Sequence, residues 1–301
     1  MKSIFIKLFR LLYETLVLLK ILKPLIVVHI DGGICSQMHQ YLLGYLFKKK
    51  GFSVKYDLTW FADHGMDINN KDVRNFDLLR AFPSLNFSAI KGNLLKLYRY
   101  FYVNVGEYPK NTDLNWVHIK PPKLLLGYYA SPDYLYEEYF HEAFKLDTSV
   151  LDAENLKIYQ LISSEISAAV HVRRGDLAVE TKAYGKPASL DYFKNAISYL
   201  KKERHTRFFY FFSDDKIYLK KELLPYLGLN ENEYQIIQNG ADKGYVDLIL
   251  MSKCKYIVTS KGSLGKFAAL LDLEDKKIVT VCKDDKQTYM LNVKQIEKIL
   301  F

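Results

Sequence analysis

Cysteine is scarce in this chain, with three residues among 301. Cys35, Cys254 and Cys282 are scattered and odd in number, so they form neither a disulfide framework nor a metal-binding spacing, and we expect a reducing, cytosolic compartment. Long apolar runs are also missing, because no uninterrupted stretch reaches the ~20 residues of a membrane-spanning helix. No small-residue cleavage site follows the apolar first 23 residues, so a signal peptide is not expected.

Several signatures of nucleotide chemistry are absent as well. The sequence has no P-loop lysine motif, no GxGxxG fingerprint and no kinase signature, which argues against phosphoryl transfer. Acidic residues are the smaller charged class, with 34 Asp and Glu against 43 Lys and Arg, and the net charge is +9. This excess predicts an anionic partner: nucleic acid, an acidic membrane surface or a phosphorylated small molecule. No recognised nucleic-acid module is present, so we do not expect nucleic acid, and an RNA binder is kept only as an alternative.

The first 23 residues form a distinct segment that is strongly apolar but interrupted by charges. Lys7, Arg10 and Glu14 share one stripe of a helix, while Lys20 and Lys23 fall elsewhere and can extend their charges toward water. This pattern predicts a basic amphipathic helix lying on an anionic membrane surface. The alternative is a helix packed on the protein's own body. Pro24 is expected to end the helix.

The rest of the chain alternates strand-like and helical segments, and its 49% hydrophobic content is enough for a full core. This alternation predicts an α/β fold with parallel sheets covered by helices on both faces. Strands are expected at residues 25–30, 51–57, 168–172, 208–212, 256–259 and 276–281. Helices are expected at residues 40–50, 76–104, 154–166, 190–204, 264–271 and 291–301, and from Asp247 onward. We therefore expect an N-terminal domain at residues 24–146 and a C-terminal domain at residues 147–301.

Four polar loops each follow the carboxyl end of an apolar strand: residues 31–37, 173–176, 213–215 and 260–263. In open α/β sheets the ligand crevice lies outside these ends, and three of the loops are in the second half of the chain. Arginines, hydroxyl groups, glycine amides and carboxylates suit a nucleoside diphosphate. Simpler interpretations stay open: a plain tight turn at residues 31–37, a helix cap at Asp214 and Asp215, and a basic loop paired with its own Asp176.

Five elements, in order along the chain, carry a resemblance to a known family. His171-Val172-Arg173-Arg174-Gly175-Asp176 resembles the HxRRxD motif of fucosyltransferases that use GDP-fucose. The segment from Gly32 to Tyr41 is similar to the GGLGNQMFQYA opening of the α-1,2-fucosyltransferases of glycosyltransferase family 11. Gly127-Tyr128-Tyr129 with Pro132 and Tyr134, Phe212-Ser213-Asp214-Asp215, and the segment from Asp247 to Cys254 resemble that family's GYFQxxxYF, FSDD and DLxLMSxC elements.

The resemblance implies a GT-B-like fold, with two Rossmann-type domains facing across a cleft, and an inverting transfer of L-fucose. It implies that residues 24–146 form the acceptor-side domain and residues 147–301 the GDP-sugar-binding domain. It implies catalytic roles for Arg173, on the β-phosphate, and for Asp176, which either orients the arginines or acts as the base. It implies donor contacts from the second domain and from the first-domain turn, by Gly33, Ser36, Gln37, His171, Arg174, Asp214, Asp215, Asp247, Ser260 and Ser263. No metal and no other cofactor is implied, because arginine takes the role of the cation.

Two departures from the family pattern concern the donor. Ser36 stands where the family usually has Asn, and residues 260–267 replace the family's NS[ST][FY]SWW segment with one extra residue and neither Trp. Lys261 in this segment offers a phosphate contact in place of a polar one. The general base stays open among Asp31, Asp63 and Asp176.

These observations predict a cytoplasmic enzyme, peripheral on the inner face of the cell membrane. It would transfer fucose from GDP-fucose in α-1,2 linkage to a galactoside-type acceptor on a lipid-linked glycan, in surface polysaccharide and O-antigen synthesis. One alternative is the same fold with a different nucleotide sugar. Another is a non-catalytic protein that binds nucleotides or glycans.

Overall fold

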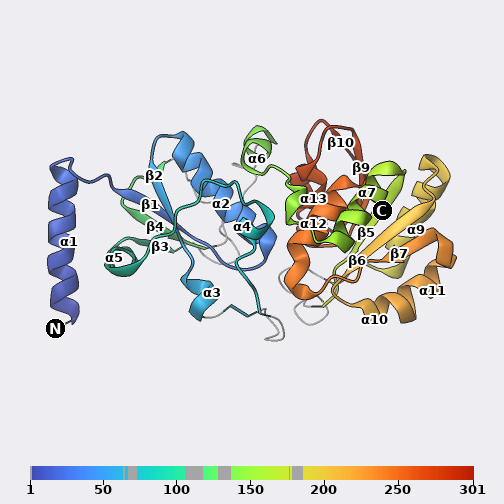
Figure 1. Ribbon diagram of the computed structural model, residues 1–301, viewed down its shortest axis with the longest axis horizontal. Coiled ribbons are helices and arrows are strands. Elements are labelled where there is room, and N and C mark those ends of the chain that lie inside the picture. The colour runs from blue at the N-terminus through green and yellow to red at the C-terminus, as the bar shows by residue number, and fades with distance from the viewer. Residues whose placement is uncertain are drawn as a thin grey trace. The chain divides into compact units, whose positions relative to one another are not determined.

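The computed structural model describes residues 2–63, 65–66, 73–105, 118–127, 137–175, 177 and 186–301. The chain forms two compact α/β units (Figure 1). Unit 1 comprises Met1–Gly65, Arg74–Phe76 and Ser84–Ala143, and unit 2 comprises Met66–Val73, Asp77–Pro83 and Phe144–Phe301. The assignment of an acceptor side and a donor side to these parts stays a prediction.

Unit 1 contains a four-stranded sheet in the order β2-β1-β4-β3, with every pair parallel. Its strands are β1 (Leu25–His29), β2 (Ser53–Asp57), β3 (Val103–Val105) and β4 (Lys123–Leu126). The central strand β1 is almost wholly buried, as expected of a continuous apolar run inside a parallel sheet. The helices are α1 (Lys2–Leu18), α2 (Ile34–Lys49), α3 (Thr59–Asp63), α5 (Gly92–Phe101) and α6 (Glu137–Ala143).

Unit 2 contains a six-stranded sheet in the order β10-β9-β8-β5-β6-β7, again with every pair parallel. Its strands are β5 (Ser167–Val172), β6 (Phe208–Ser213), β7 (Tyr234–Ile236), β8 (Tyr256–Thr259), β9 (Lys277–Val281) and β10 (Ile296–Leu300). Taken in chain order, this is the 3-2-1-4-5-6 arrangement of the doubly wound Rossmann fold. The predicted α/β class, with two Rossmann-type units of the GT-B-like kind, is confirmed.

Helices cover both faces of this sheet (Figure 1). The main helices of unit 2 are α7 (Ala153–Ser164), α9 (Leu190–Arg204), α12 (Gly244–Lys253) and α13 (Leu264–Leu271). Shorter ones are α4 (Leu78–Ala81), α10 (Lys216–Tyr218) and α11 (Leu224–Leu227), with single turns at 148–150, 219–223, 231–233, 241–243 and 288–291. Alternate residues of β5, namely Ala168, Val170 and Val172, share a buried cluster with α9. The opposite face of β5 therefore carries Ala169 and His171.

Helix α9 illustrates how local signals position an element. Ser189 caps its first turn by accepting a hydrogen bond from the Tyr192 N–H, and His205 ends it in a left-handed conformation with φ of 54°. Between these ends, Tyr192, Phe193, Ala196, Ile197 and Leu200 are buried at helical spacing. The predicted bounds of this helix, residues 190–204, are confirmed.

Three predicted elements are corrected by the structure. Residues 291–301 do not form a terminal helix, because Ile296–Leu300 pair with β9 as the edge strand β10, and sheet pairing outweighs the weak helix preference of a short segment. The expected helix at residues 76–104 is divided into α4, α5 and strand β3. Pro83 and the positive φ of Gly92 explain this division. Helix α1 ends at Leu18, six residues before Pro24.

None of the helices in the described part of the chain combines the length and the apolar character needed to cross a membrane.

Candidate functional site

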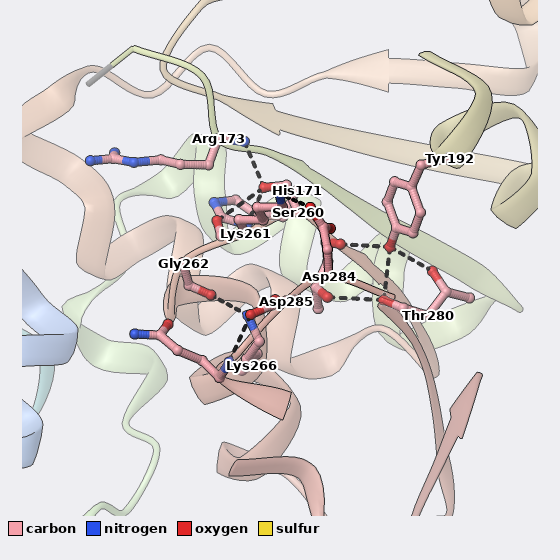
Figure 2. Close-up of polar contacts among 12 residues, drawn as sticks. His171, Arg173, Tyr192, Ser260, Lys261, Gly262, Lys266, Thr280, Asp284 and Asp285 are labelled. Carbon is pink, nitrogen blue, oxygen red and sulfur yellow. Dashed lines mark hydrogen bonds and ion pairs between the residues drawn. The ribbon is translucent and has the colours of Figure 1, made fainter. Parts of the chain in front are cut away.

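The loops after β5 and β8 meet at the point of the sheet where the strand order reverses. In doubly wound folds a ligand crevice opens beside such a point. Ser260 joins the two loops here (Figure 2). Its N–H donates to the His171 carbonyl at 3.1 Å, and its hydroxyl oxygen accepts from the Arg173 N–H at 2.8 Å. The structure thus brings together three of the predicted site residues.

His171 is buried beneath this junction. Its Nδ1 lies 3.3 Å from the Ser260 hydroxyl oxygen. On α13, a Cβ at Gly265 would lie 3.3 Å from the same ring nitrogen, a contact tight enough that a larger residue would displace the imidazole slightly. Burial, together with the nearby cations Arg173 and Lys266, lowers the pKa of His171 to about 3. The imidazole is therefore neutral in the folded protein at physiological pH.

Asp214, at the end of β6, organises the loop that follows β5. Its two carboxylate oxygens accept hydrogen bonds from the main-chain N–H groups of Arg174 at 2.9 Å and Gly175 at 3.1 Å. Its Oδ2 also lies 3.0 Å from Nη1 of Arg173. A Cβ at Gly175 would stand 3.0 Å from this oxygen, which explains glycine at that position. Asp214 thus holds both the loop backbone and the Arg173 guanidinium.

Arg174 has different partners from its neighbour. Its guanidinium lies 4.0 Å from the ring centroid of Tyr218, and its Nε is 3.6 Å from Asp215. Asp215 in turn caps α10 by accepting from the Tyr218 N–H at 2.9 Å. The two adjacent arginines therefore have different partners. The capping interpretation for Asp215 is confirmed. Asp176, the predicted partner of the arginines, lies outside the described residues.

The loop after β8 rests on a buried cation that the motif comparison missed. Lys266 of α13 is fully buried, and its Nζ donates to the Gly262 carbonyl at 2.5 Å and lies 2.5 Å from Asp285 (Figure 2). Lys261 pairs with the exposed Asp284 at 2.5 Å. These two pairs connect the loop after β8, which includes Ser263, to the loop after β9. A lysine in the otherwise apolar segment 264–271 is the sequence signal that could have found this pair.

The Tyr192 hydroxyl, on α9, makes hydrogen bonds near the carboxyl ends of β8 and β9. It donates toward the carbonyl oxygens of Thr259 at 2.6 Å and Thr280 at 2.9 Å, at the ends of β8 and β9. A residue of α9 thereby links the carboxyl-terminal parts of β8 and β9, next to the loop that begins at Ser260.

Asp247, on α12, belongs to an amide network. The Asn239 side chain donates to Asp247 Oδ1 at 2.7 Å, and Asn239 and Asn155 exchange amide hydrogen bonds. Burial raises the pKa of Asp247 to about 7, although the Asn239 hydrogen bond and the charge of Lys216 oppose this rise. Asp247 thus changes its charge near neutral pH.

In unit 1 the predicted turn after β1 is held by side chains of α2. Gly32 has a positive φ of 69°, and Gly33 is the N-cap residue of α2. Gln37 is fully buried and donates to the carbonyl oxygens of Gly32 and Asn75, each at 2.9 Å. Ser36 is also buried. Through these two hydrogen bonds, Gln37 stabilises the turn between β1 and α2.

A second polar cluster of unit 1 was missed by the sequence argument. Asp57, at the end of β2, lies 3.1 Å from His29 Nδ1 and accepts from Arg99 at 2.7 and 3.0 Å. Burial tends to raise the pKa of Asp57, but hydrogen bonds from His29, Thr59 and Arg99 outweigh it and hold the pKa well below its usual range. The ends of β1 and β2 and a residue of α5, all distant in sequence, form this cluster.

Asp31 lies two residues beyond His29 and is oriented by Gln40. Gln40 Nε2 donates to Asp31 Oδ1 at 2.7 Å, and the Asp31 N–H donates back to the Gln40 amide oxygen at 2.9 Å. Burial raises the pKa of Asp31, while the Gln40 hydrogen bond and the nearby His29 oppose the rise. A carboxyl group with a raised pKa is a stronger base once ionised.

Among the described residues, no group of three or more His, Cys, Asp or Glu side chains is arranged to hold a metal.

Comparison with known proteins shows that the chain is a glycosyltransferase. A model of glycosyl transferase family 11 matches residues 111–298, more than half of the chain, and the chain belongs to that family. The predicted family is confirmed.

Two curated relatives and a solved structure show the breadth of the similarity. An α-1,2-colitosyltransferase of Escherichia coli is 27% identical over 262 residues, which is 82% of this chain and 87% of that protein. The O-antigen biosynthesis glycosyltransferase WbnK of Escherichia coli is 23% identical over 287 residues, 83% of this chain and 91% of that protein. A structure of the fucosyltransferase NodZ from Bradyrhizobium aligns with 83% of this chain and 94% of its own, with 12% identity and a TM-score of 0.48.

The raised pKa of Asp247 predicts how stability depends on pH. Between about pH 4 and 7 the unfolded chain releases this proton while the folded chain retains it, so the free energy of unfolding falls as pH rises. The Asp247→Asn variant still accepts from Asn239 but carries no titrating group. Relative to this variant, the parent should lose stability with a slope approaching about 1.4 kcal/mol per pH unit in this range.

Urea unfolding of parent and variant at half-unit pH steps measures this difference. Asp275→Asn, at an exposed carboxyl, serves as the control and should leave the slope of the parent unchanged. Identical pH slopes for the parent and Asp247→Asn would contradict the assignment.

Proposed function

We propose that this chain transfers L-fucose, or a closely related 6-deoxy sugar, from its GDP conjugate to a galactoside-type acceptor in α-1,2 linkage. The observation that carries the proposal is the position of Arg173 at the switch point of unit 2. Its main chain is held by Ser260 and its guanidinium by Asp214. A pre-positioned guanidinium beside the carboxyl ends of parallel strands suits the diphosphate of a nucleotide sugar.

The proposed chemistry places Arg173 on the β-phosphate of the departing GDP. Negative charge builds on this phosphate as the bond to the sugar breaks, and an arginine is always protonated at physiological pH. A preorganised donor of this kind contributes about 3–4 kcal/mol to transition-state stabilisation. Arginine thereby supplies the cation, and the reaction as proposed needs no metal or other cofactor. Asp214 is a positioning residue, since it holds the guanidinium and the loop.

The proposal includes the predicted contacts to the nucleoside and to the sugar of the donor. Asp247 carries a carboxylate suited to the N–H donors of guanine, and Arg174 presents its guanidinium beside Tyr218. Ser260, Lys261 and Ser263 line the switch-point loop where this chain departs from the family pattern. Gly33, Ser36 and Gln37 of unit 1 stay proposed donor contacts.

An inverting transfer also needs a base for the acceptor hydroxyl. Of the three predicted candidates, Asp31 is favoured, because burial raises its pKa and Gln40 orients its carboxyl group. Asp63 is exposed at the end of α3 and lacks this environment. Deprotonation by Asp31 would make the acceptor oxygen nucleophilic as it attacks the sugar's anomeric carbon.

The donor and the pathway are proposed from the relatives. Colitose is L-fucose without its 3-hydroxyl group, so GDP-colitose is a second candidate donor, supported by the colitosyltransferase relative. WbnK takes part in O-antigen biosynthesis, which supports a glycan acceptor of surface polysaccharide synthesis, with lipid linkage and a cytoplasmic site of action as part of the proposal.

A transfer assay tests this function. The purified chain, treated with EDTA, is incubated with GDP-fucose, GDP-colitose or UDP-galactose and a soluble β-galactoside, and the product linkage is read by NMR. We expect transfer from a GDP-6-deoxy sugar to the 2-hydroxyl of galactose. Transfer from UDP-galactose alone would show that the donor is a UDP-sugar and not a GDP-sugar. A linkage to another hydroxyl would refute the proposed regiochemistry.

The adjacent arginines provide a matched pair of variants for the phosphate role. Arg173→Lys retains the charge but loses the planar fork, so kcat should fall by about 10²–10³-fold. Arg174→Lys removes a stacked guanidinium beside Tyr218 and should cost less than tenfold. Steady-state kinetics with saturating acceptor measure both. Equal losses, or an Arg173→Lys enzyme that turns over like the parent, would rule out the bidentate phosphate contact.

The base assignment is tested by removing the ionisable group and preserving its shape. Asp31→Asn should lower kcat by about 10²–10⁴-fold, the usual contribution of general base catalysis, while GDP affinity stays unchanged. Asp63→Asn and Asp176→Asn, the two rival candidates, are measured beside it by the same assay. If a rival variant loses more activity than Asp31→Asn while its GDP affinity stays unchanged, the base is that residue and not Asp31.

A further inference from the structure

Helix α1 packs on the rest of unit 1 through a side that combines apolar residues with hydrogen-bonding ones. Tyr13 is buried, and its hydroxyl oxygen lies 2.5 Å from that of Tyr98 on α5. Glu14 accepts from Arg10 and from the Tyr102 hydroxyl, each at 2.8 Å. The Arg10 guanidinium also lies 4.6 Å from the ring centroid of Phe101. Two of the charges that interrupt the apolar sequence, Arg10 and Glu14, are therefore engaged by the protein itself, and α1 is fixed on α5.

The outward side of α1 is apolar. At 100° per residue its outward arc is occupied by large aliphatic and aromatic side chains that are 55–81% exposed, namely Ile4, Phe5, Leu8, Leu11, Leu12 and Leu18. Thr15 is the polar residue within this arc, and its hydroxyl donates to the Leu11 carbonyl. The inward side of α1 is apolar as well, because Ile6 and Tyr13 are buried in the core of unit 1 and Phe9 and Val17 pack against it. A surface helix of a soluble protein ordinarily keeps its outward side polar, and α1 departs from this pattern.

The apolar surface continues beyond the helix and has cationic margins. Leu19, Ile21 and Leu22 are 42–64% exposed in the turn that follows α1. Lys7 borders the arc on the helix, and Lys20 and Lys23 are exposed beside the turn. Glu14 is the one acidic residue among the first 23, and it is engaged by Arg10 and Tyr102. We call these nine exposed apolar residues and three lysines the α1 face.

We propose that the α1 face binds the surface of an anionic lipid bilayer, with α1 lying in the plane of the interface while it remains packed on α5. Exposed apolar surfaces of this extent mark interaction sites. Amphipathic helices of this kind sink about 5–10 Å into the boundary between headgroups and acyl chains, and lysines at the margin contact anionic headgroups. A second copy of the chain fits less well, because the like-charged margins would meet across a two-fold contact.

The proposal combines the two interpretations that the sequence left open, since the helix packs on the body and also keeps a free apolar face. Within the predicted stripe of Lys7, Arg10 and Glu14, the side chains of Arg10 and Glu14 face α5. The membrane-facing side is instead the leucine-rich arc, and no detachment of α1 is required. The proposal is independent of which sugar donor is used.

Vesicle flotation of the full chain tests the proposal. The parent should float with vesicles of phosphatidylcholine and phosphatidylglycerol and more weakly with phosphatidylcholine alone. The triple variant Leu8→Gln, Leu11→Gln and Leu12→Gln retains helix-forming residues and should bind at least tenfold more weakly. The matched control, Leu161→Gln, Ile166→Gln and Ile217→Gln, removes equally exposed apolar residues of unit 2 and should float like the parent.

Charge and folding are tested separately. The double variant Lys7→Gln and Lys23→Gln should lose about fivefold in affinity per lysine, and raising the salt concentration should weaken the parent similarly. Circular dichroism and transfer to a soluble acceptor should be the same for all variants, which shows that they are folded. Flotation of the leucine variant equal to that of the parent would overturn the proposal. So would light scattering that shows the parent as a dimer, dissociated by the same substitutions, without vesicle binding.

Discussion

The candidate site depends on the hydrogen bonds and the ion pair that the Asp214 carboxylate makes. It accepts two main-chain N–H groups of the loop after β5 and pairs with the Arg173 guanidinium, so one side chain sets both the loop path and the direction of the cation. Ser260 holds the same loop from β8 through the Arg173 N–H. Charge-assisted hydrogen bonds of this kind are stronger than neutral ones. A guanidinium held in this way is ready for an anion without further reorganisation.

Much of the fold could be predicted because its signals are local. The buried strand Phe208–Ser213 is a continuous apolar run, and the glycine-containing loops at the strand ends mark the edge where ligands bind. Strand order, by contrast, depends on pairing between distant segments. This is why β10 was expected to be a helix: nothing within residues 291–301 indicates that β9 is its neighbour.

The site was predictable only where a motif lies in one contiguous stretch. Arg173, Arg174 and Asp214 fall in such motifs, but the pairing of Arg173 with Asp214 joins two separate motifs and was not predicted. The Lys266–Asp285 pair and the cluster of His29, Asp57 and Arg99 join residues that are 19 to 70 positions apart, and no local pattern links them. Helix periodicity has the same limit at α1, because it identifies two stripes but does not say which one packs on α5.

The most direct test of the account is calorimetric titration of the purified chain, without divalent metal, with GDP, GDP-fucose, GDP-colitose, GDP-mannose, UDP-galactose and UDP-GlcNAc. The account predicts binding of GDP and of a GDP-6-deoxy sugar, with UDP-sugars binding far more weakly. It also predicts that Arg173→Lys weakens GDP binding, because the diphosphate contact is lost. Selective binding of a UDP-sugar, or no binding of GDP, would contradict the claim that the switch-point loops of unit 2 bind a GDP-sugar.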